Sequence, residues 1–234
     1  MAELDLEALR ANLEAVRERL SRAAQRSGRN PEAIRLLAVT KTLPLGAVEL
    51  ARRAGLKLFG ENRVQEAEEK YASMAGEVEL HLIGHLQRNK AGKAAGLFAC
   101  IQSIDRVETA QALNRCCAQR GRTLPILLEM NTSGEASKSG FRSLEELLEA
   151  AERIAELELL SIRGLMTVGP LSADGEEVRR AFALLRRSYG RLQERCPSLA
   201  LDTLSMGMSG DFEIAIEEGA TLVRVGTALF GARS

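Results

Sequence analysis

Residues 34–44, with the sequence IRLLAVTKTLP, form an apolar run that ends in a lysine, Lys41, and soon afterwards a proline. A short apolar run bounded in this way is typical of a buried β-strand. A charged ammonium at the end of a buried strand is costly unless a function at that place needs an amine. Lys41 is therefore the first candidate for a functional residue.

Seven further β-like runs follow this one, separated by segments of helical character. We predict strands within residues 35–41, 56–62, 78–84, 98–105, 124–131, 161–169, 201–209 and 221–231. Strands that alternate with helices indicate βαβ units and a parallel sheet. Eight such units predict a closed (β/α)₈ TIM barrel of the α/β class. The alternative is an open doubly wound sheet, but no glycine-rich dinucleotide fingerprint follows the first strand.

The residues before the first strand predict an additional helix. Four apolar residues recur there at helical spacing: Leu9, Leu13, Val16 and Leu20. Gly28 and Pro31 mark the end of this amphipathic segment. We therefore expect a leading helix within residues 1–28 and a single barrel domain over residues 1–234.

Composition and charge exclude several functional classes. The chain has 32 basic and 32 acidic residues, so it lacks the basic footprint of a nucleic-acid-binding protein. It has no run of roughly 18 apolar residues to span a membrane and no signal-peptide pattern. Its four cysteines form no CxxC pair, and no spacing of His, Cys or carboxylate residues predicts a metal site. We expect a reduced, cytoplasmic protein without metal, membrane or nucleic-acid partners.

Polar and small residues gather where the last two predicted strands end, at 205–211 (SMGMSGD) and 224–231 (RVGTALFG). In (β/α)₈ barrels, functional residues lie at the C-terminal ends of strands, and phosphate sites often form after strands 7 and 8. The hydroxyls of Ser205, Ser209 and Thr227 suit a phosphate, and the neighbouring glycines let the backbone approach it. The alternative is that these glycines serve only tight turns.

Arg224 adds a buried charge to this region. Period-2 alternation in TLVRVGT places Arg224 on the inward face of its strand, because the flanking valines face the helices. A buried guanidinium needs a partner, which is either a carboxylate such as Glu129 or Glu61, or an acceptor on a ligand. A lysine opposite a phosphate site, with an arginine between them, matches the dimensions of pyridoxal 5'-phosphate (PLP). The aldehyde would meet Lys41, the phosphate the last two loops, and the pyridine nitrogen Arg224. On spacing alone, a sugar-phosphate isomerase could use the same parts.

Seven segments resemble, in order and spacing, the pyridoxal-phosphate homeostasis protein family, whose barrel is similar to the N-terminal domain of alanine racemase. They are LLAVTKT, FGENRVQE, HLIGHLQRNK, QSIDR, NTSGEASKSGF, RGLMTVGP and LSMGMSGDFEIAIEEGATLVRVGTALFGAR. The resemblance runs from about residue 5 to residue 233, and the long closing segment is its most specific part.

The resemblance implies a PLP cofactor held as a Schiff base on Lys41 and a role in intracellular PLP (vitamin B6) homeostasis. Its implied phosphate contacts are Ser205, the backbone of Met206 and Gly207, and Gly226 and Thr227. It places Arg224 at the pyridine nitrogen, and it matches Asn62 and Met166 to positions that line the ring.

Catalysis requires more than this binding site. An arginine at the pyridine nitrogen disfavours its protonation and weakens the ring as an electron sink. The second base of alanine racemase is a tyrosine from another domain of a partner subunit, whereas Tyr71 and Tyr189 here lie in predicted helices, away from the strand ends. We expect a monomeric PLP-binding protein, with no catalytic residue of its own, that supplies PLP-dependent apoenzymes. The alternative is a small PLP-dependent enzyme similar to an amino-acid racemase.

Three further polar residues have expected positions. His81 is expected in the core and His85 at the rim, where it could line the pocket. Lys138, on the loop after the fifth strand, is expected to be a solvated loop lysine, with contact to an anionic ligand as the alternative.

Overall fold

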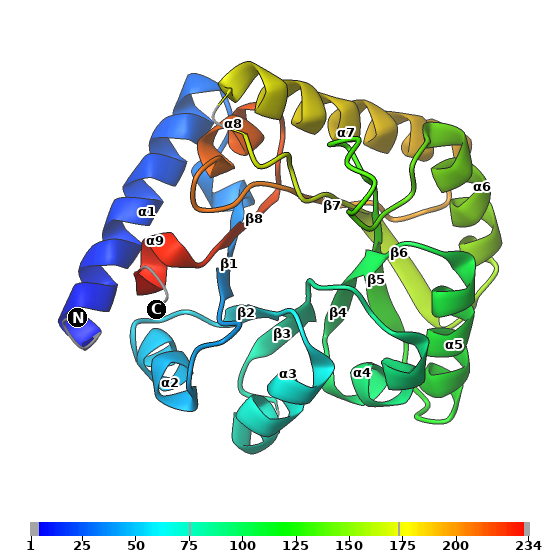
Figure 1. Cartoon of the computed structure of the whole chain (residues 1–234), viewed down its shortest axis with the longest axis horizontal. Helices are drawn as coiled ribbons and strands as arrows, with labels where there is room; N and C mark the ends of the chain where they lie inside the picture. The colour runs from blue at the N-terminus through cyan, green and yellow to red at the C-terminus, as the bar shows by residue number, and fades with distance from the viewer. Residues whose placement is uncertain (1–4, 75, 173, 232–234) are drawn as a thin grey trace.

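The computed structural model describes residues 5–74, 76–172 and 174–231. Over these residues, eight parallel strands close into a barrel in chain order, with β8 paired to β1 (Figure 1). They are β1 Arg35–Val39, β2 Leu58–Glu61, β3 Glu79–Leu82, β4 Cys100–Ile104, β5 Leu124–Glu129, β6 Leu160–Met166, β7 Thr203–Ser205 and β8 Leu222–Val225. The closed barrel confirms the predicted fold class and excludes the open sheet.

A helix follows each strand and covers the outside of the barrel (Figure 1). These helices are α2 Leu45–Arg53, α3 Val64–Tyr71, α4 Ala91–Leu97, α5 Val107–Ala118, α6 Leu144–Ala155, α7 Gly175–Arg195, α8 Phe212–Glu217 and α9 Thr227–Phe230. Short 3₁₀ turns occur at η1 Pro31–Ala33, η2 Ala72–Met74 and η3 Arg88–Lys90.

The leading helix α1, Leu6–Arg26, lies beside α8 and α9 (Figure 1). Asp5 caps its first turn, because the Asp5 carboxylate accepts from the Ala8 N–H at 2.8 Å. The amide of Asn12 donates to the Leu229 carbonyl at 2.9 Å and ties the helix to the end of the chain. The predicted apolar stripe is buried. Residues 1–4 of the predicted helix lie outside the described residues.

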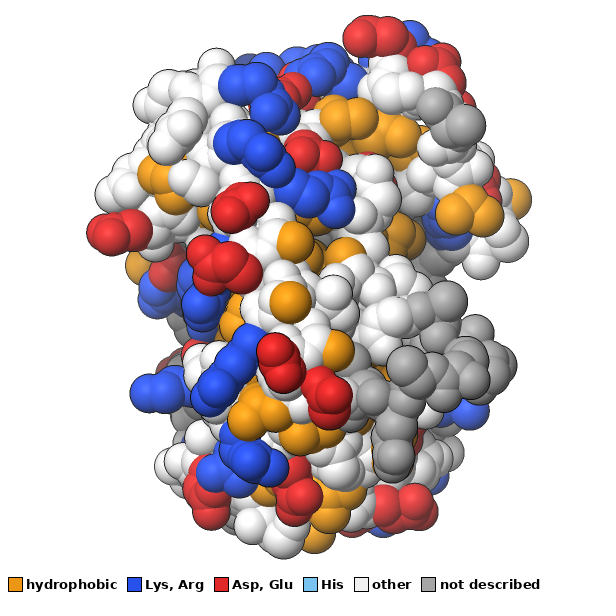
Figure 2. All heavy atoms as spheres, turned by 90° about the vertical axis from the view of Figure 1, so that its left-hand side faces the viewer, with side chains coloured by type: hydrophobic (Ala, Val, Ile, Leu, Met, Phe, Trp, Pro, Cys, Tyr) orange, Lys and Arg blue, Asp and Glu red, His pale blue; other side chains and the backbone are white. Residues whose placement is uncertain are grey.

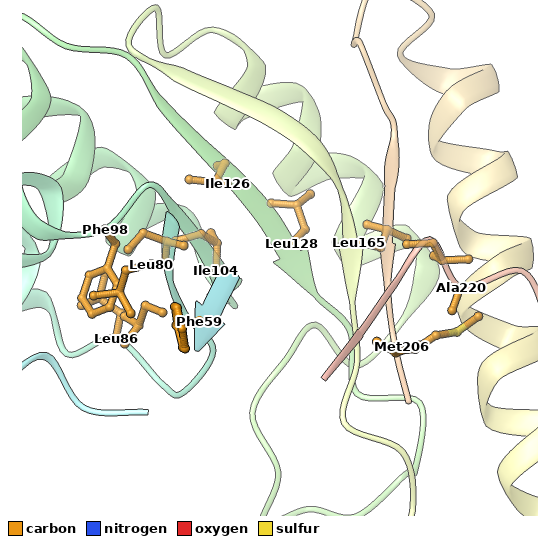
Figure 3. Close-up of a cluster of buried hydrophobic side chains, with 14 of the residues drawn as sticks. Phe59, Leu80, Leu86, Phe98, Ile104, Ile126, Leu128, Leu165, Met206 and Ala220 are labelled. Carbon is orange, nitrogen blue, oxygen red and sulfur yellow. The ribbon is translucent and has the colours of Figure 1, made fainter. Parts of the chain in front are cut away.

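The main apolar core lies between the barrel and its helices. Large side chains on the outward faces of successive strands pack there, including Phe59, Ile104, Ile126 and Leu165 (Figure 3). Burial of each such side chain is worth about 1.5–3 kcal/mol. The inward faces form two smaller clusters, one around Leu37 and the other around Leu127 and Met166.

The outer surface has mixed charge. Figure 2 shows Lys and Arg side chains interspersed with Asp and Glu on the face that carries α1. Several of these charges are paired between elements, as Arg19 is with Glu213 at 2.9 Å. In the described part of the chain, no helix is long and apolar enough to cross a membrane.

A bulge in β6 depends on one glycine. The register between β5 and β6 shifts after Ile126, and Gly164, which pairs with Leu127, has a φ of 151°. A Cβ on Gly164 would lie 1.7 Å from the Thr203 carbonyl oxygen of β7. Neither the backbone conformation nor the space therefore admits a side chain at this position.

Replacement of Gly164 by alanine is expected to lower the free energy of unfolding by about 3 kcal/mol, because it combines backbone strain with a clash against backbone. Urea denaturation followed by circular dichroism measures the change. Gly190→Ala is the control, since Gly190 lies within α7 and a Cβ there meets nothing within 4 Å. We expect the control to gain roughly 0.5–1 kcal/mol, and equal stabilities for the two variants would contradict this account.

Candidate functional site

A cavity of about 390 Å³ lies at the C-terminal end of the barrel strands. Its volume falls within the roughly 300–1,000 Å³ of typical small-molecule sites. The residues that line it are Val39, Lys41, Asn62, Ile83, Val168, Met208, Ser209, Gly210, Arg224, Gly226 and Thr227. This is the end of the barrel at which TIM-barrel enzymes place their functional groups.

Strand β1 delivers Lys41 to this cavity. Leu37 and Val39 pack in the inward cluster, whereas Ala38 belongs to the outer core. Lys41 continues the inward series, is half-buried and lines the cavity. The next residue, Thr42, has a φ of 62°, a left-handed conformation that is rare for a β-branched residue.

Strand β8 directs Arg224 into the same cavity, as the alternation predicted. Arg224 is 3% exposed. Its Nη1 donates to Ser205 Oγ at 2.7 Å and its Nη2 donates to the Thr167 carbonyl at 2.6 Å. Of the two alternatives for its partner, these hydrogen bonds do not support a carboxylate, because both acceptors are neutral oxygens. Glu61 is paired with Lys70 instead, at 2.8 Å.

A chain of hydrogen bonds continues from Ser205 through the barrel interior. Ser205 Oγ donates to Gln102 Oε1 at 2.7 Å, and Gln102 Nε2 lies 2.8 Å from His81 Nδ1. His81 Nε2 lies 2.9 Å from Glu79 Oε1, and Arg35 Nη2 donates to Glu79 Oε2 at 2.7 Å. Since an amide nitrogen only donates, His81 Nδ1 accepts and Nε2 carries the ring proton. The core position expected for His81 is confirmed.

Burial perturbs the charges around Arg224. Desolvation lowers the pKa of Arg224 to about 10, against the charges of Asp211 and Glu129, so the guanidinium stays cationic at neutral pH. Desolvation also raises the pKa of Glu129 to about 7; the charge of Asp105 adds to this effect and that of Arg224 opposes it. Arg224 therefore places a positive charge at the cavity, and its hydrogen bonds go to Ser205 and Thr167 and not to the carboxylates of Asp211 and Glu129.

The loops after β7 and β8 are joined through Ser209. Its Oγ accepts from the N–H groups of Gly226 and Ala228, each at 3.2 Å. Gly207 has a φ of 91°, and a Cβ there would lie 2.5 Å from the Ala215 Cβ. Packing against α8 and backbone conformation thus account for a glycine at position 207, as the turn interpretation proposed.

Of the nine cofactor-binding residues predicted from the sequence, some line the cavity and others do not. Those that line the cavity are Lys41, Asn62, Arg224, Gly226 and Thr227. Those outside the lining set are Met166, Ser205, Met206 and Gly207. Met166 is fully buried beside Cys100 and Leu127, and the Met206 side chain packs in the outer core (Figure 3). Ser205 touches the site through its bond to Arg224.

Sequence reasoning missed the apolar part of the wall. Val39, Ile83, Val168 and Met208 line the cavity. Val39 lies two residues before Lys41, so the alternation that placed Arg224 would also have found this position. These apolar side chains carry no polar group that would mark them as functional in the sequence.

Two expectations about polar side chains are wrong. The Tyr71 hydroxyl lies 2.7 Å from Thr40 Oγ1, so Tyr71 lies next to the C-terminal end of β1 and not away from the strand ends. Lys138 is not the fully solvated loop lysine that we expected, because its side chain is 22% exposed and its Nζ donates to Glu135 Oε1 at 2.6 Å and to the Gly169 carbonyl at 2.9 Å. Both side chains are held by the loops around the barrel mouth.

His85 is exposed and lines a second surface pocket together with Asn62, which also lines the cavity. Its Nδ1 is 3.2 Å from Asp105 Oδ2, and it is not among the residues that line the cavity. Within the described residues, no group of three or more His, Cys, Asp or Glu side chains could hold a metal ion.

Sequence relatives of this chain match nearly its whole length. The sequence profile described as "Alanine racemase, N-terminal domain" matches residues 4–234. The pyridoxal phosphate homeostasis protein of Pseudomonas aeruginosa is 46% identical over 226 residues, which cover 95% of this chain and 94% of that protein. The protein of the same name from Escherichia coli K12 is 45% identical over 233 residues, 95% of each chain.

Solved structures share the fold. An unknown protein from Bifidobacterium adolescentis has a TM-score of 0.89 at 36% identity, over 96% of this chain and 95% of its own. PipY of Synechococcus elongatus PCC7942, with PLP bound, has a TM-score of 0.84 at 36% identity, over 95% of this chain and 100% of its own. These matches show that the chain belongs to the pyridoxal phosphate homeostasis proteins, within the alanine racemase N-terminal domain family.

Proposed function

We propose that this protein binds PLP as a Schiff base on Lys41 and acts in intracellular PLP homeostasis. The observation that carries the proposal is the presence of Lys41, Arg224 and Thr227 in the wall of one cavity. The names of the sequence relatives and the PLP-bound structure of PipY, which is 36% identical, support the same cofactor.

The lining residues fit a flat aromatic aldehyde that carries a phosphate. Lys41 offers the amine, and apolar side chains such as Val39 and Ile83 offer surfaces for a ring. Ser209 and Thr227 bring hydroxyls to the side of the cavity where the β7 and β8 loops meet. We propose that the phosphate lies against Thr227 and the backbone of Gly226.

Lys41 is the proposed nucleophile. Its amine would hold the aldehyde carbon of PLP through a C=N bond, with the aldehyde oxygen released as water together with both amine hydrogens. When bound, PLP supplies an electron-accepting ring. The protein contributes the position of the amine and the exclusion of bulk water by the surrounding apolar wall.

Arg224 is the proposed neighbour of the pyridine nitrogen. Its bonds to Ser205 and Thr167 use two of the five N–H donors of a guanidinium, which leaves donors for a ligand. Its positive charge disfavours protonation of the ring nitrogen. Ser205 gives its single hydroxyl proton to Gln102, so we assign it to holding Arg224 in preference to the phosphate.

We propose binding and release of PLP in preference to turnover. Among the described residues that line the cavity, the ionisable side chains are those of Lys41 and Arg224. Racemisation needs a second base on the opposite face of the substrate, and a guanidinium with a pKa of about 10 is a poor base at neutral pH.

We further propose that the protein works in the cytoplasm as a monomer and supplies PLP-dependent apoenzymes. The cysteines of the described chain, Cys100, Cys116, Cys117 and Cys196, are all free thiols, as expected in a reducing compartment. The sequence relatives are named for pyridoxal phosphate homeostasis, and we propose that release of the cofactor to other proteins is part of this role.

Lys41→Ala is expected to abolish the visible absorption band of the PLP complex, because no amine remains to form the Schiff base. Residual PLP affinity is expected through the phosphate contacts, so the readout is colour and not retention. Lys138→Ala is the control, since Lys138 is a lysine held on a neighbouring loop by Glu135. Retention of the band in Lys41→Ala, with its loss in Lys138→Ala, would overturn the assignment.

Arg224→Gln is expected to leave the Schiff base intact but to shift its absorption maximum, because the ring nitrogen loses a cationic neighbour. Spectra of the reconstituted proteins over a pH series measure the shift. Arg35→Gln is the control at the far, exposed end of the interior chain. A wild-type spectrum for Arg224→Gln would mean that Arg224 only supports the barrel interior.

A further inference from the structure

A buried polar cluster lies behind Lys41, on the outer face of β1 and β2. Three residues of α3 reach into it, Glu66, Lys70 and Tyr71, and we refer to them as the α3 clamp. They meet Thr40 at the end of β1 and Glu61 at the end of β2. None of these five residues lines the cavity, so the proposed function does not account for them.

Lys70 is the centre of the clamp. Its side chain is 6% exposed. Its Nζ donates to the Thr40 carbonyl at 2.8 Å, to Glu61 Oε1 at 2.8 Å and to Glu66 Oε1 at 2.9 Å. Three acceptors match the three hydrogens of an ammonium, so this buried charge is fully hydrogen-bonded.

The clamp holds the residues on both sides of Lys41. Before it, Thr40 is fully buried, and its Oγ1 lies 2.7 Å from both Glu61 Oε1 and the Tyr71 hydroxyl. After it, the Thr42 N–H donates to Glu66 Oε1, the oxygen that also accepts from Lys70. Thr42 has a φ of 62°, and a β-branched residue keeps such a conformation only where its surroundings impose it.

The charges of the clamp agree with this geometry. Burial raises the pKa of Glu66, but the hydrogen bonds from Lys70 and the Thr42 N–H outweigh it and leave that pKa below its ordinary value. Glu66 is therefore a carboxylate at neutral pH, able to accept from both donors. It links the cation of the clamp directly to the strained turn after Lys41.

We propose that Lys70 is a positioning residue for Lys41. It fixes the backbone on either side of Lys41 and so holds the Lys41 amine toward the cavity before a ligand arrives. Such preorganisation raises the rate at which a positioned nucleophile reacts. The inference rests on the proposed function, because it concerns the approach of Lys41 to the aldehyde of PLP.

The test compares two ligands in Lys70→Met. PLP can react with Lys41, whereas 4'-deoxypyridoxine 5'-phosphate has a methyl group in place of the aldehyde and can only bind. We expect stopped-flow absorbance to show Schiff-base formation slowed by roughly tenfold or more. The affinity for the deoxy ligand, measured by calorimetry, is expected to stay near the wild-type value. A purely structural role for Lys70 would weaken both.

Lys93→Met is the matched control. Lys93 lies on α4 and pairs with Glu68 of α3 at 2.5 Å, with both side chains about half exposed, and neither residue belongs to the α3 clamp. This variant also removes a lysine–glutamate pair involving α3, so we expect wild-type behaviour with both ligands.

Glu66→Ala provides a second variant that does not bury an unpaired charge. Glu66 is 25% exposed on its side chain, and its loss frees the Thr42 N–H and one hydrogen of Lys70. We expect slower Schiff-base formation with unchanged deoxy-ligand affinity, and this variant decides the question if Lys70→Met fails to fold. Wild-type rates in the variants would refute the inference, whereas a wild-type protein that forms no Schiff base would refute the proposed function.

Discussion

A guanidinium buried inside a barrel is the constraint on which the interior of this protein depends. Among the residues that the structure describes, no carboxylate is hydrogen-bonded to Arg224. Its Nη1 donates to Ser205, and the hydrogen bonds continue from Ser205 through Gln102 to His81. Burial lowers the pKa of His81, which keeps the ring neutral and able to accept from Gln102. The run ends at Glu79, whose pKa the bond to His81 lowers to about 2. A run of oriented hydrogen bonds thus connects the Arg224 cation at the cavity to the Glu79 carboxylate at the far end. We expect this network to hold the Arg224 side chain more rigidly than a single ion pair would.

At the C-terminal end of β1, the inward face of the strand presents a residue to the cavity and the outward face is fixed by hydrogen bonds. The inward face ends in Lys41, at the cavity, and the outward face ends in Thr40. The Thr40 hydroxyl is hydrogen-bonded to Glu61 and Tyr71, and its carbonyl accepts from Lys70. A flexible lysine gains precision when its backbone is held on both sides, and a polar network can do this where apolar packing alone leaves the turn free to relax. This network requires a buried ion pair between Lys70 and Glu61, and removing both charges from water costs free energy. We therefore expect the pair to contribute more to a defined geometry than to stability.

The sequence predicted the barrel, the position of Lys41 and the inward direction of Arg224, because these follow from strand periodicity and from the rule that parallel strands end together. It did not predict what Arg224 binds. Ser205 and Gln102 are 103 positions apart, and only the closure of the barrel brings them within 2.7 Å. Tyr71 was misplaced for a related reason: its helix was recognised, but the rotation of α3 against β1 is set by packing that no local pattern encodes. Gly207 was ambiguous in the sequence because a turn and a ligand contact both favour glycine, and the proximity of Ala215 accounts for it.

The most direct test of the account is the chemical identity of the residue that holds PLP. Reduction of the PLP-loaded protein with borohydride converts a Schiff base into a stable amine, and peptide mass spectrometry then locates the modified side chain. We expect one phosphopyridoxyl group per chain on Lys41, with Lys70, Lys93 and Lys138 unmodified. Recovery of the group on Lys138, or distribution over several exposed lysines, would contradict it.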